Sequence, residues 1–431
     1  MFEVILILIL IVAVAFFARF NEGSWLSPGA FFAMLWSLYI LCALFFIEDF
    51  DTLSGALLWI FLSCGAIHVG CLFGRGLTDR KGRTSNVIGS TNLADFPNLK
   101  KFLLFFTLIG LIEICFIFYK TGFSMTTFLS LESISEVSVI NRADFGFGDL
   151  NQGVIERILF ILIYSAPLFG GVLYKLTPSK RVKILTVISL FMPVLAGTLY
   201  GSRMGVLFGG SFWISAHMAT HLLTKKTKRI RDRGYVFRIL AISVLVITGL
   251  SLFVMIIRYQ ETSIITADLL IRNLSDQFTF FPAFAQWFQS EGLRFSDLTF
   301  GHRTFGRTYE LLGIHFADQY FYYSTDLGFT TSNIFTVFRD LIEDFSPIGA
   351  VVCLFLIGCA GGVSYRRVLK GEIKFLPLLT TIYVFTFTSF SFSLFVYTAP
   401  TLALVIFWAY FLCFRRDLRE NRNEMLKPSA T

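Results

Sequence analysis

The sequence predicts an all-α polytopic membrane protein with about eleven transmembrane helices, and three observations support this fold class. Hydrophobic residues make up 55% of the 431 positions and charged residues only 15%, whereas roughly a quarter of a soluble domain is charged. The mean hydropathy is +0.69. Apolar runs long enough to cross about 30 Å of hydrocarbon recur along the chain. We therefore expect one transmembrane domain over residues 1–431.

The apolar runs place the expected spans. The first run, Val4–Phe17, has neither a basic start nor a small-residue cleavage site, so we interpret it as a retained span and not as a signal peptide. The eleven expected spans are 2–18, 28–47, 54–73, 101–119, 154–174, 183–200, 203–223, 236–257, 346–363, 375–395 and 397–414.

The positive charges predict the orientation. Most of the 37 Lys and Arg residues fall in alternate short loops, for example 225–238 and 415–427, and the acidic run 48–51 falls on the other side. Because cytoplasmic loops carry an excess of Lys and Arg, we expect the N-terminus outside and the C-terminus inside. Residues 258–345 then form one long outer loop rich in phenylalanine. Helical apolar spacing over Ile265–Gln289 predicts short amphipathic helices that lie on the bundle.

Several function classes lack their motifs. The net charge of +8 comes from loops beside apolar spans, which argues against nucleic acid as a partner. There is no phosphate-binding Walker loop, no G-x-G-x-x-G and no H-E-x-x-H. We therefore expect no cofactor and no ATP or sugar-nucleotide substrate. The seven cysteines lie in apolar stretches without a C-x-x-C pair, and His217 and His221 lack a third ligand, so we expect no metal site.

Arginines on the expected outer side are the residues that point to a ligand. Arg203 follows Gly201 and Ser202 in the turn between two spans, and Arg258 closes the eighth span. The others lie in outer loops, at Arg142, Arg272, Arg303, Arg307 and Arg339. Cations there run against the orientation rule, and a guanidinium binds phosphate bidentately. This pattern favours a phosphate or pyrophosphate ligand. Taken singly, each arginine is also consistent with a side chain that faces lipid headgroups or lies on an ordinary surface.

This arrangement resembles the bacterial oligosaccharide repeat-unit polymerases, the Wzy-type O-antigen and capsule polymerases. Three places carry the resemblance: the GSR turn at 201–203, the stretch SNIFTVFRDLIEDFSPIG at 332–349, and Arg142 followed eleven residues later by Gly153. The chain departs from the family in its odd number of expected spans.

The resemblance implies a GT-C-like, metal-independent glycosyltransferase in the bacterial inner membrane. Its donor would be a glycan on undecaprenyl pyrophosphate, its acceptor a second lipid-linked repeat unit, and its neighbours membrane lipids and a chain-length regulator protein. Arg203, Arg258 and Arg339 would stabilise the departing pyrophosphate, and a general base would activate the acceptor hydroxyl. For that base we favour His302 or His315 over Glu261, Asp326, Asp340 and Asp344. Substrate binding would involve Arg142, Arg272, Arg303, Arg307, Asn333 and Asp344.

Three alternatives stay open. An O-antigen ligase shares the layout but transfers the glycan to a lipid A core. A lipid-linked oligosaccharide flippase or other transporter needs charges within the bundle, of which Glu113 is the clearest. A structural or assembly protein would carry the arginines incidentally.

Overall fold

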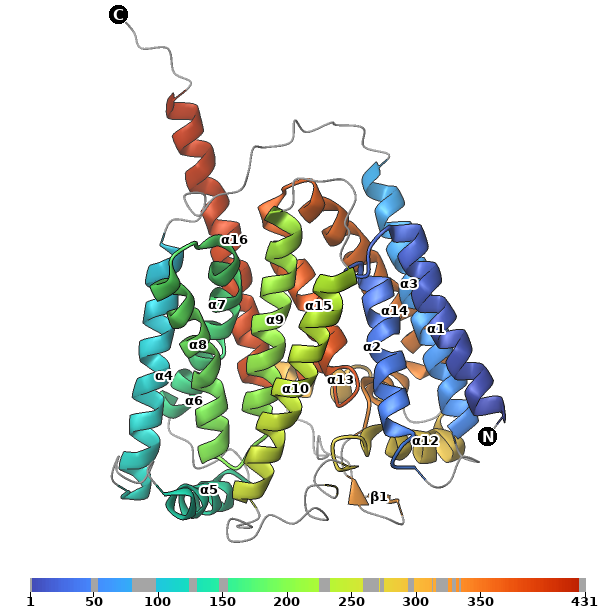
Figure 1. The fold of residues 1–431 in the computed structure, drawn as a ribbon, viewed down its shortest axis with the longest axis horizontal. Helices are drawn as coiled ribbons and strands as arrows, with labels where there is room; N and C mark the ends of the chain where they lie inside the picture. Colours follow the sequence, from blue (N-terminus) through green and yellow to red (C-terminus); the bar gives the residue numbers. More distant parts are fainter. Residues whose placement is uncertain are drawn as a thin grey trace, which may run out of the picture.

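Within the described residues, helices occupy the long apolar runs in the computed structural model (Figure 1). The structure describes residues 2–47, 53–79, 98–123, 130–146, 154–224, 233–258, 271, 275–293, 298–311, 313–314, 325–327, 331–332 and 335–425. The first half contains α1 (Phe2–Glu22), α2 (Pro28–Ala43), α3 (Leu53–Asp79), α4 (Leu99–Thr121), α5 (Leu131–Gly146), α6 (Val154–Ile163), α7 (Ser165–Leu176), α8 (Lys180–Leu199) and α9 (Met204–Thr224).

The second half interleaves short and long elements. It contains α10 (Arg233–Arg258), α12 (Phe280–Glu291), α13 (His302–Leu311), the paired strands β1 (Thr325–Asp326) and β2 (Thr331–Ser332), α14 (Val337–Leu369), α15 (Leu376–Thr388) and α16 (Thr398–Met425), with 3-10 turns at Ile373–Phe375 and Leu394–Val396. The two strands pair antiparallel, with Thr325 opposite Ser332.

The long apolar helices show that the protein is embedded in a membrane. Within the described residues, six stretches are long and apolar enough to cross one: Phe2–Glu22, Leu53–Thr78, Leu99–Thr121, Ile155–Leu176, Lys180–Leu199 and Val337–Leu369. Shorter apolar stretches are Pro28–Ala43, Thr248–Ile257, Ile373–Thr388 and Thr398–Cys413. The total of eleven spans stays a prediction, as does the orientation. Helix α1 begins at the same end of the bundle as α5 and α12, and α16 ends at the other end (Figure 1).

Three elements differ from the expected pattern. The span expected at 154–174 is two helices, α6 and α7, with a break at Tyr164. A helix, α5, crosses one end of the bundle within what the sequence presents as a polar loop. The span expected to begin at 346 is the continuation of α14, which starts at Val337 and bends at Ser346, where φ is 67° and ψ is 167°, directly before Pro347. A proline removes one helical hydrogen bond and clashes with the preceding turn, which accounts for the bend.

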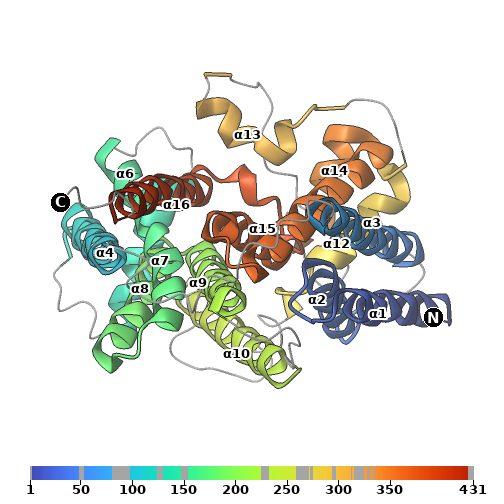
Figure 2. The same cartoon turned by 90° about the horizontal axis from the view of Figure 1, so that it is seen from above.

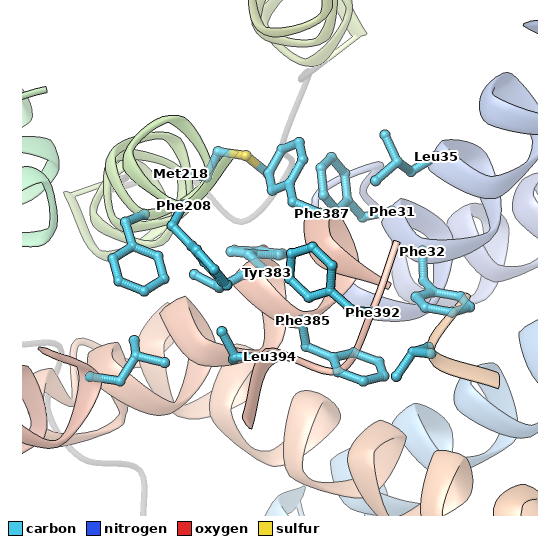
Figure 3. Close-up of a cluster of buried hydrophobic side chains, with 14 of the residues drawn as sticks. Phe31, Phe32, Leu35, Phe208, Met218, Tyr383, Phe385, Phe387, Phe392 and Leu394 are labelled. Carbon is cyan, nitrogen blue, oxygen red and sulfur yellow. The ribbon is translucent and has the colours of Figure 1, made fainter. Parts of the chain in front are cut away.

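An aromatic core joins α2, near the start of the chain, to α15, near its end. From above, α15 lies between α9 on one side and α2 and α14 on the other (Figure 2). Phe31 and Phe32 of α2 meet Tyr383, Phe385 and Phe387 of α15 in edge and stacked ring contacts (Figure 3). The Trp36 indole also donates a 3.0 Å hydrogen bond to Ser389 Oγ, 353 positions away. The first and last quarters of the chain therefore share one core.

Glycines bring α3 and α14 into backbone contact. A Cβ at Gly70 or Gly74 would lie 2.2 or 2.1 Å from the carbonyl oxygen of Phe355 or Cys359, and one at Gly362 would lie 2.1 Å from that of Cys71. Such close approach is the usual role of small residues at membrane helix contacts, where packing replaces the hydrophobic driving force. The α3–α14 glycine seam, as we name Gly70, Gly74, Gly358 and Gly362, therefore fixes α14 against the first helices.

We expect Gly74→Ala to lower stability by about 1–3 kcal/mol, because the new methyl group would force the two backbones apart. The measurement is the thermal unfolding midpoint of the detergent-solubilised protein. Gly76→Ala is the matched control, since a Cβ there meets nothing within 4 Å and alanine favours a helix over glycine. Equal midpoints for the two variants would show that the seam does not require glycine.

Candidate functional site

A largely apolar cavity of about 180 Å³ lies between α2, α9, α10 and the C-terminal end of α15. Its wall includes Leu35, Leu207, Phe278 and Phe390, and Arg203 is the one charged side chain among the described residues that line it. An engineered apolar cavity of about 150 Å³ takes up benzene, so this one has room for an apolar group of roughly that size. An apolar space with one cation at its wall suits an amphiphilic anion.

The turn between α8 and α9 explains why the sequence reads Gly-Ser-Arg at 201–203. Gly201 has φ of +60°, and its amide donates to the carbonyl oxygen of Thr198 while the Ser202 amide donates to that of Gly197. This pair of bonds ends α8 in a Schellman motif, which needs a left-handed residue such as glycine. Ser202 Oγ then accepts from the Met204 amide at 3.3 Å, and Arg203 O accepts from Leu207, so α9 begins at once. Arg203 is thus held at a helix start.

A second polar region lies where α13 meets the first turns of α14. The Asp344 carboxylate, which is 0% exposed, accepts hydrogen bonds from Thr299 Oγ1, the Arg303 amide at 2.9 Å and the Thr304 amide at 2.6 Å. These amides belong to the first turn of α13, whose preceding residue, Gly301, has no side chain to cap them. Asp344 therefore serves as the N-terminal cap of α13 from another helix.

Arg339 and Arg303 converge on Glu343 beside this cap. Arg339 Nε lies 2.7 Å from Glu343 Oε1 and Arg303 Nε lies 3.2 Å from Glu343 Oε2. The Arg339 guanidinium also stacks over the rings of Phe335, at 4.0 Å, and Trp287, at 5.0 Å. The three charged side chains are 15–20% exposed. In this group, the α13–α14 arginine cluster, two guanidinium groups therefore share the one Glu343 carboxylate.

One short turn connects the cavity to the α13–α14 arginine cluster. Phe390, Ser391 and Phe392 line the cavity. The next residue, Ser393, donates its amide to Asp340 Oδ2 at 3.0 Å and its hydroxyl to the Thr304 carbonyl oxygen at 3.0 Å. The two regions are therefore neighbours that share residues 390–393 as a wall. Arg339 does not line the cavity, so it does not join Arg203 there.

The other expected site residues fall into three groups. His302 begins α13 and is 3% exposed. Arg258 ends α10, Arg142 lies in α5 and Arg307 lies in α13, but their side chains are outside the described part of the structure. Arg272, His315 and Asn333 lie outside the described residues altogether. His217 and His221 pack on aromatic rings, with the His221 ring stacked 3.8 Å from that of Tyr235.

Comparisons with known proteins found no match. No family model, no curated protein and no solved structure aligns significantly with this chain. The function must therefore be argued from the two regions above.

Sequence reasoning missed Glu343 and Trp287 as members of a charged site. Glu343 follows Arg339 by four positions, the spacing at which opposite charges pair on a helix, so the pair itself could have been found. Trp287 comes from α12, about 50 positions earlier in the chain, and no local pattern indicates that its ring lies under Arg339.

We expect Asp344→Ala to loosen α13, because two amides and a hydroxyl would lose their acceptor. Leaving a buried donor without an acceptor costs about 1–3 kcal/mol of stability. Hydrogen exchange of a peptide covering 299–311 measures this, and exchange should rise at the first turn of α13. Glu343→Gln is the control, since Glu343 accepts no α13 amide in the described bonds. Unchanged exchange in Asp344→Ala would contradict the capping role.

Proposed function

We propose that this protein is a membrane glycosyltransferase of the repeat-unit polymerase kind, GT-C-like in architecture. It would join undecaprenyl-pyrophosphate-linked oligosaccharides at the outer side of a bacterial inner membrane. The observation that carries the proposal is Arg203, a cation in the wall of an otherwise largely apolar cavity. The type of reaction is proposed from the resemblance of the GSR turn and of residues 332–349 to those polymerases.

The cavity would hold the first part of the lipid donor. Its volume fits about one isoprene unit, by comparison with apolar cavities that take up benzene. The pyrophosphate would then lie against the Arg203 guanidinium, which can donate two parallel hydrogen bonds to phosphate oxygens. Beside a largely apolar wall the effective dielectric constant is lower, so the attraction would be stronger than at an exposed surface.

The reaction would transfer a glycan from pyrophosphate to a sugar hydroxyl. The acceptor oxygen attacks the anomeric carbon, the bond to the pyrophosphate oxygen breaks, and the bonding pair leaves with the lipid pyrophosphate. A fixed guanidinium stabilises this developing charge without reorganisation. The hydroxyl proton passes to a base, for which His302 and His315 remain our candidates.

The α13–α14 arginine cluster would receive the sugars. It neighbours the cavity through residues 390–393, and Arg303 and Arg339 are partly exposed there. Of the expected bases in this region, Asp344 already accepts three hydrogen bonds from the protein. Its role in our proposal is therefore to hold α13 and, with it, His302 and Arg303.

Deleting the gene tests the reaction directly. Loss of a polymerase leaves single repeat units on the lipid carrier, whereas loss of a ligase leaves finished polymer on that carrier. Pulse-labelled lipid-linked glycans on a gel separate the two outcomes. As a second arm, proteoliposomes supplied with the lipid-linked units on the outer face alone should lengthen them, which a flippase would not do. A normal ladder in the deletion strain would overturn the proposal.

A further inference from the structure

A buried polar cluster joins α4, α6 and the end of α8 next to the turn that carries Arg203. The Tyr200 hydroxyl, directly after α8, lies 3.0 Å from Glu113 Oε1 of α4 and 3.1 Å from Glu156 Oε1 of α6. Glu113 is 0% exposed and Glu156 is 3% exposed. Lys120, in the last turn of α4, reaches Glu156 Oε1 at 3.5 Å. None of this uses the cavity, which Tyr200, Glu113 and Glu156 do not line.

The Tyr200 hydroxyl stabilises this cluster because buried carboxyl groups need hydrogen-bond donors. Glu113 Oε2 is buried with no hydrogen-bond partner among the described residues, so the bond to Oε1 matters more. A phenol hydroxyl is protonated at neutral pH, and the two carboxyl oxygens within hydrogen-bond reach favour that protonated form. The hydroxyl therefore keeps its proton and remains a donor. Ionisable groups placed within a membrane bundle at this cost usually serve a function.

Tyr200 and Arg203 are mechanically linked. Only Gly201 and Ser202 separate them, and the amides of both residues are bonded back to α8. From α5, the Asn141 side-chain amide donates to the Leu199 carbonyl oxygen at 3.1 Å and so holds the same helix end. A Cβ at Gly197 would lie 2.9 Å from the Gly205 Cα, so α8 and α9 are also in backbone contact here. A short, hydrogen-bonded segment therefore connects the Tyr200 ring to the start of α9.

We propose that Tyr200, with Glu113 and Glu156 as its acceptors, is a positioning residue that holds the Arg203 guanidinium at the cavity wall. The inference rests on the proposed function, since it assigns these groups to the site for the anionic lipid. The cluster is buried and does not touch the ligand. It fixes the turn before Arg203 through the Tyr200 hydroxyl, for which Glu113 and Glu156 are both acceptors.

The test measures the affinity of the purified protein for undecaprenyl phosphate by native mass spectrometry. Tyr200→Phe removes the hydroxyl alone, and we expect a loss of about tenfold, equivalent to about 1.4 kcal/mol. The matched control is Tyr383→Phe, which removes another buried hydroxyl bond, to the Leu26 carbonyl oxygen. That control should keep wild-type affinity. An equal loss in both variants would mean general loosening and would overturn the inference.

A double-mutant cycle shows whether Tyr200 acts through Arg203. If it does, Tyr200→Phe causes no further loss in an Arg203→Ala background, so the two effects are not additive. Independent, additive losses would overturn the positioning role. Glu113 supplies a second pair of variants: Glu113→Gln keeps an oxygen acceptor and should retain affinity, whereas Glu113→Leu leaves Glu156 as the remaining acceptor and should lose part of the affinity that Tyr200→Phe loses. Full affinity in Arg203→Ala alone would instead defeat the proposed function, and the positioning role with it.

Discussion

Arg203→Ala should leave the protein in the membrane and stop chain extension, with a rate loss of roughly 100–1,000-fold, the usual cost of removing one fixed donor to a developing negative charge. The reason is local: Arg203 is the one charged side chain among the described residues of the cavity wall. Nothing else described there would replace its attraction for pyrophosphate. The measurement is the length distribution of lipid-linked glycans on a gel, together with the amount of protein in the membrane fraction.

Two further variants define the Arg203 effect. Arg203→Lys keeps the charge but loses the planar pair of donors, so we expect intermediate chain extension. Lys180→Ala removes an exposed cation at the opposite end of α8 and should behave as wild type. Long-chain polymer at the normal level in Arg203→Ala would defeat the role that we assign to this residue.

Arg339→Ala should have the second largest effect, a loss on the order of 100-fold. The substitution removes a guanidinium that is stacked on Phe335 and Trp287 and paired with Glu343. In our proposal it therefore removes both a donor for the glycan and the cation that covers two rings. The same gel measures the result, and an unchanged ladder would contradict it.

Glu343→Gln separates a binding role of Arg339 from a structural one. It breaks the ion pairs with Arg339 and Arg303 but leaves Arg339 stacked on its two rings. If Arg339 only stabilises α14 through its ion pair, the two variants lose activity to the same extent. We expect Glu343→Gln to retain most activity, since a partly exposed ion pair contributes only about 0–1 kcal/mol.

The helices could be predicted from the sequence because lipid imposes a simple rule. Backbone polar groups in hydrocarbon must bond within the segment, so an apolar run such as Phe2–Glu22 has to be a helix. The exceptions have identifiable causes. The polar helix α5 gains its bonds from distant partners, such as the Ile257 and Leu199 carbonyl oxygens, which accept from Ser135 and Asn141. The early start of α14 depends on Asp340, which bonds Ser393, and on Asp344, which bonds the first turn of α13.

The site could be predicted only in part, because its geometry depends on long-range packing. The GSR turn drew attention to Arg203, which lies in a cavity wall, and the catalytic role of this residue stays a prediction. Arg339, which the sequence groups with Arg203, does not line that cavity. Position along the chain and expected depth in the membrane do not determine on which side of the 390–393 turn a side chain lies. The placement of the Arg258 side chain stays a prediction, because it is outside the described part of the structure.

The α3–α14 glycine seam also sets an order of events during synthesis. Gly362 follows Gly74 by about 290 residues, and ribosomes add about 5–20 residues per second. Helix α3 therefore spends roughly 15 to 60 s in the membrane before its glycines can meet their partner. During this interval it can pack on α1, on α2 and later on α12, and the Trp36 indole still lacks Ser389. The bundle is complete only after the last quarter of the chain has been inserted.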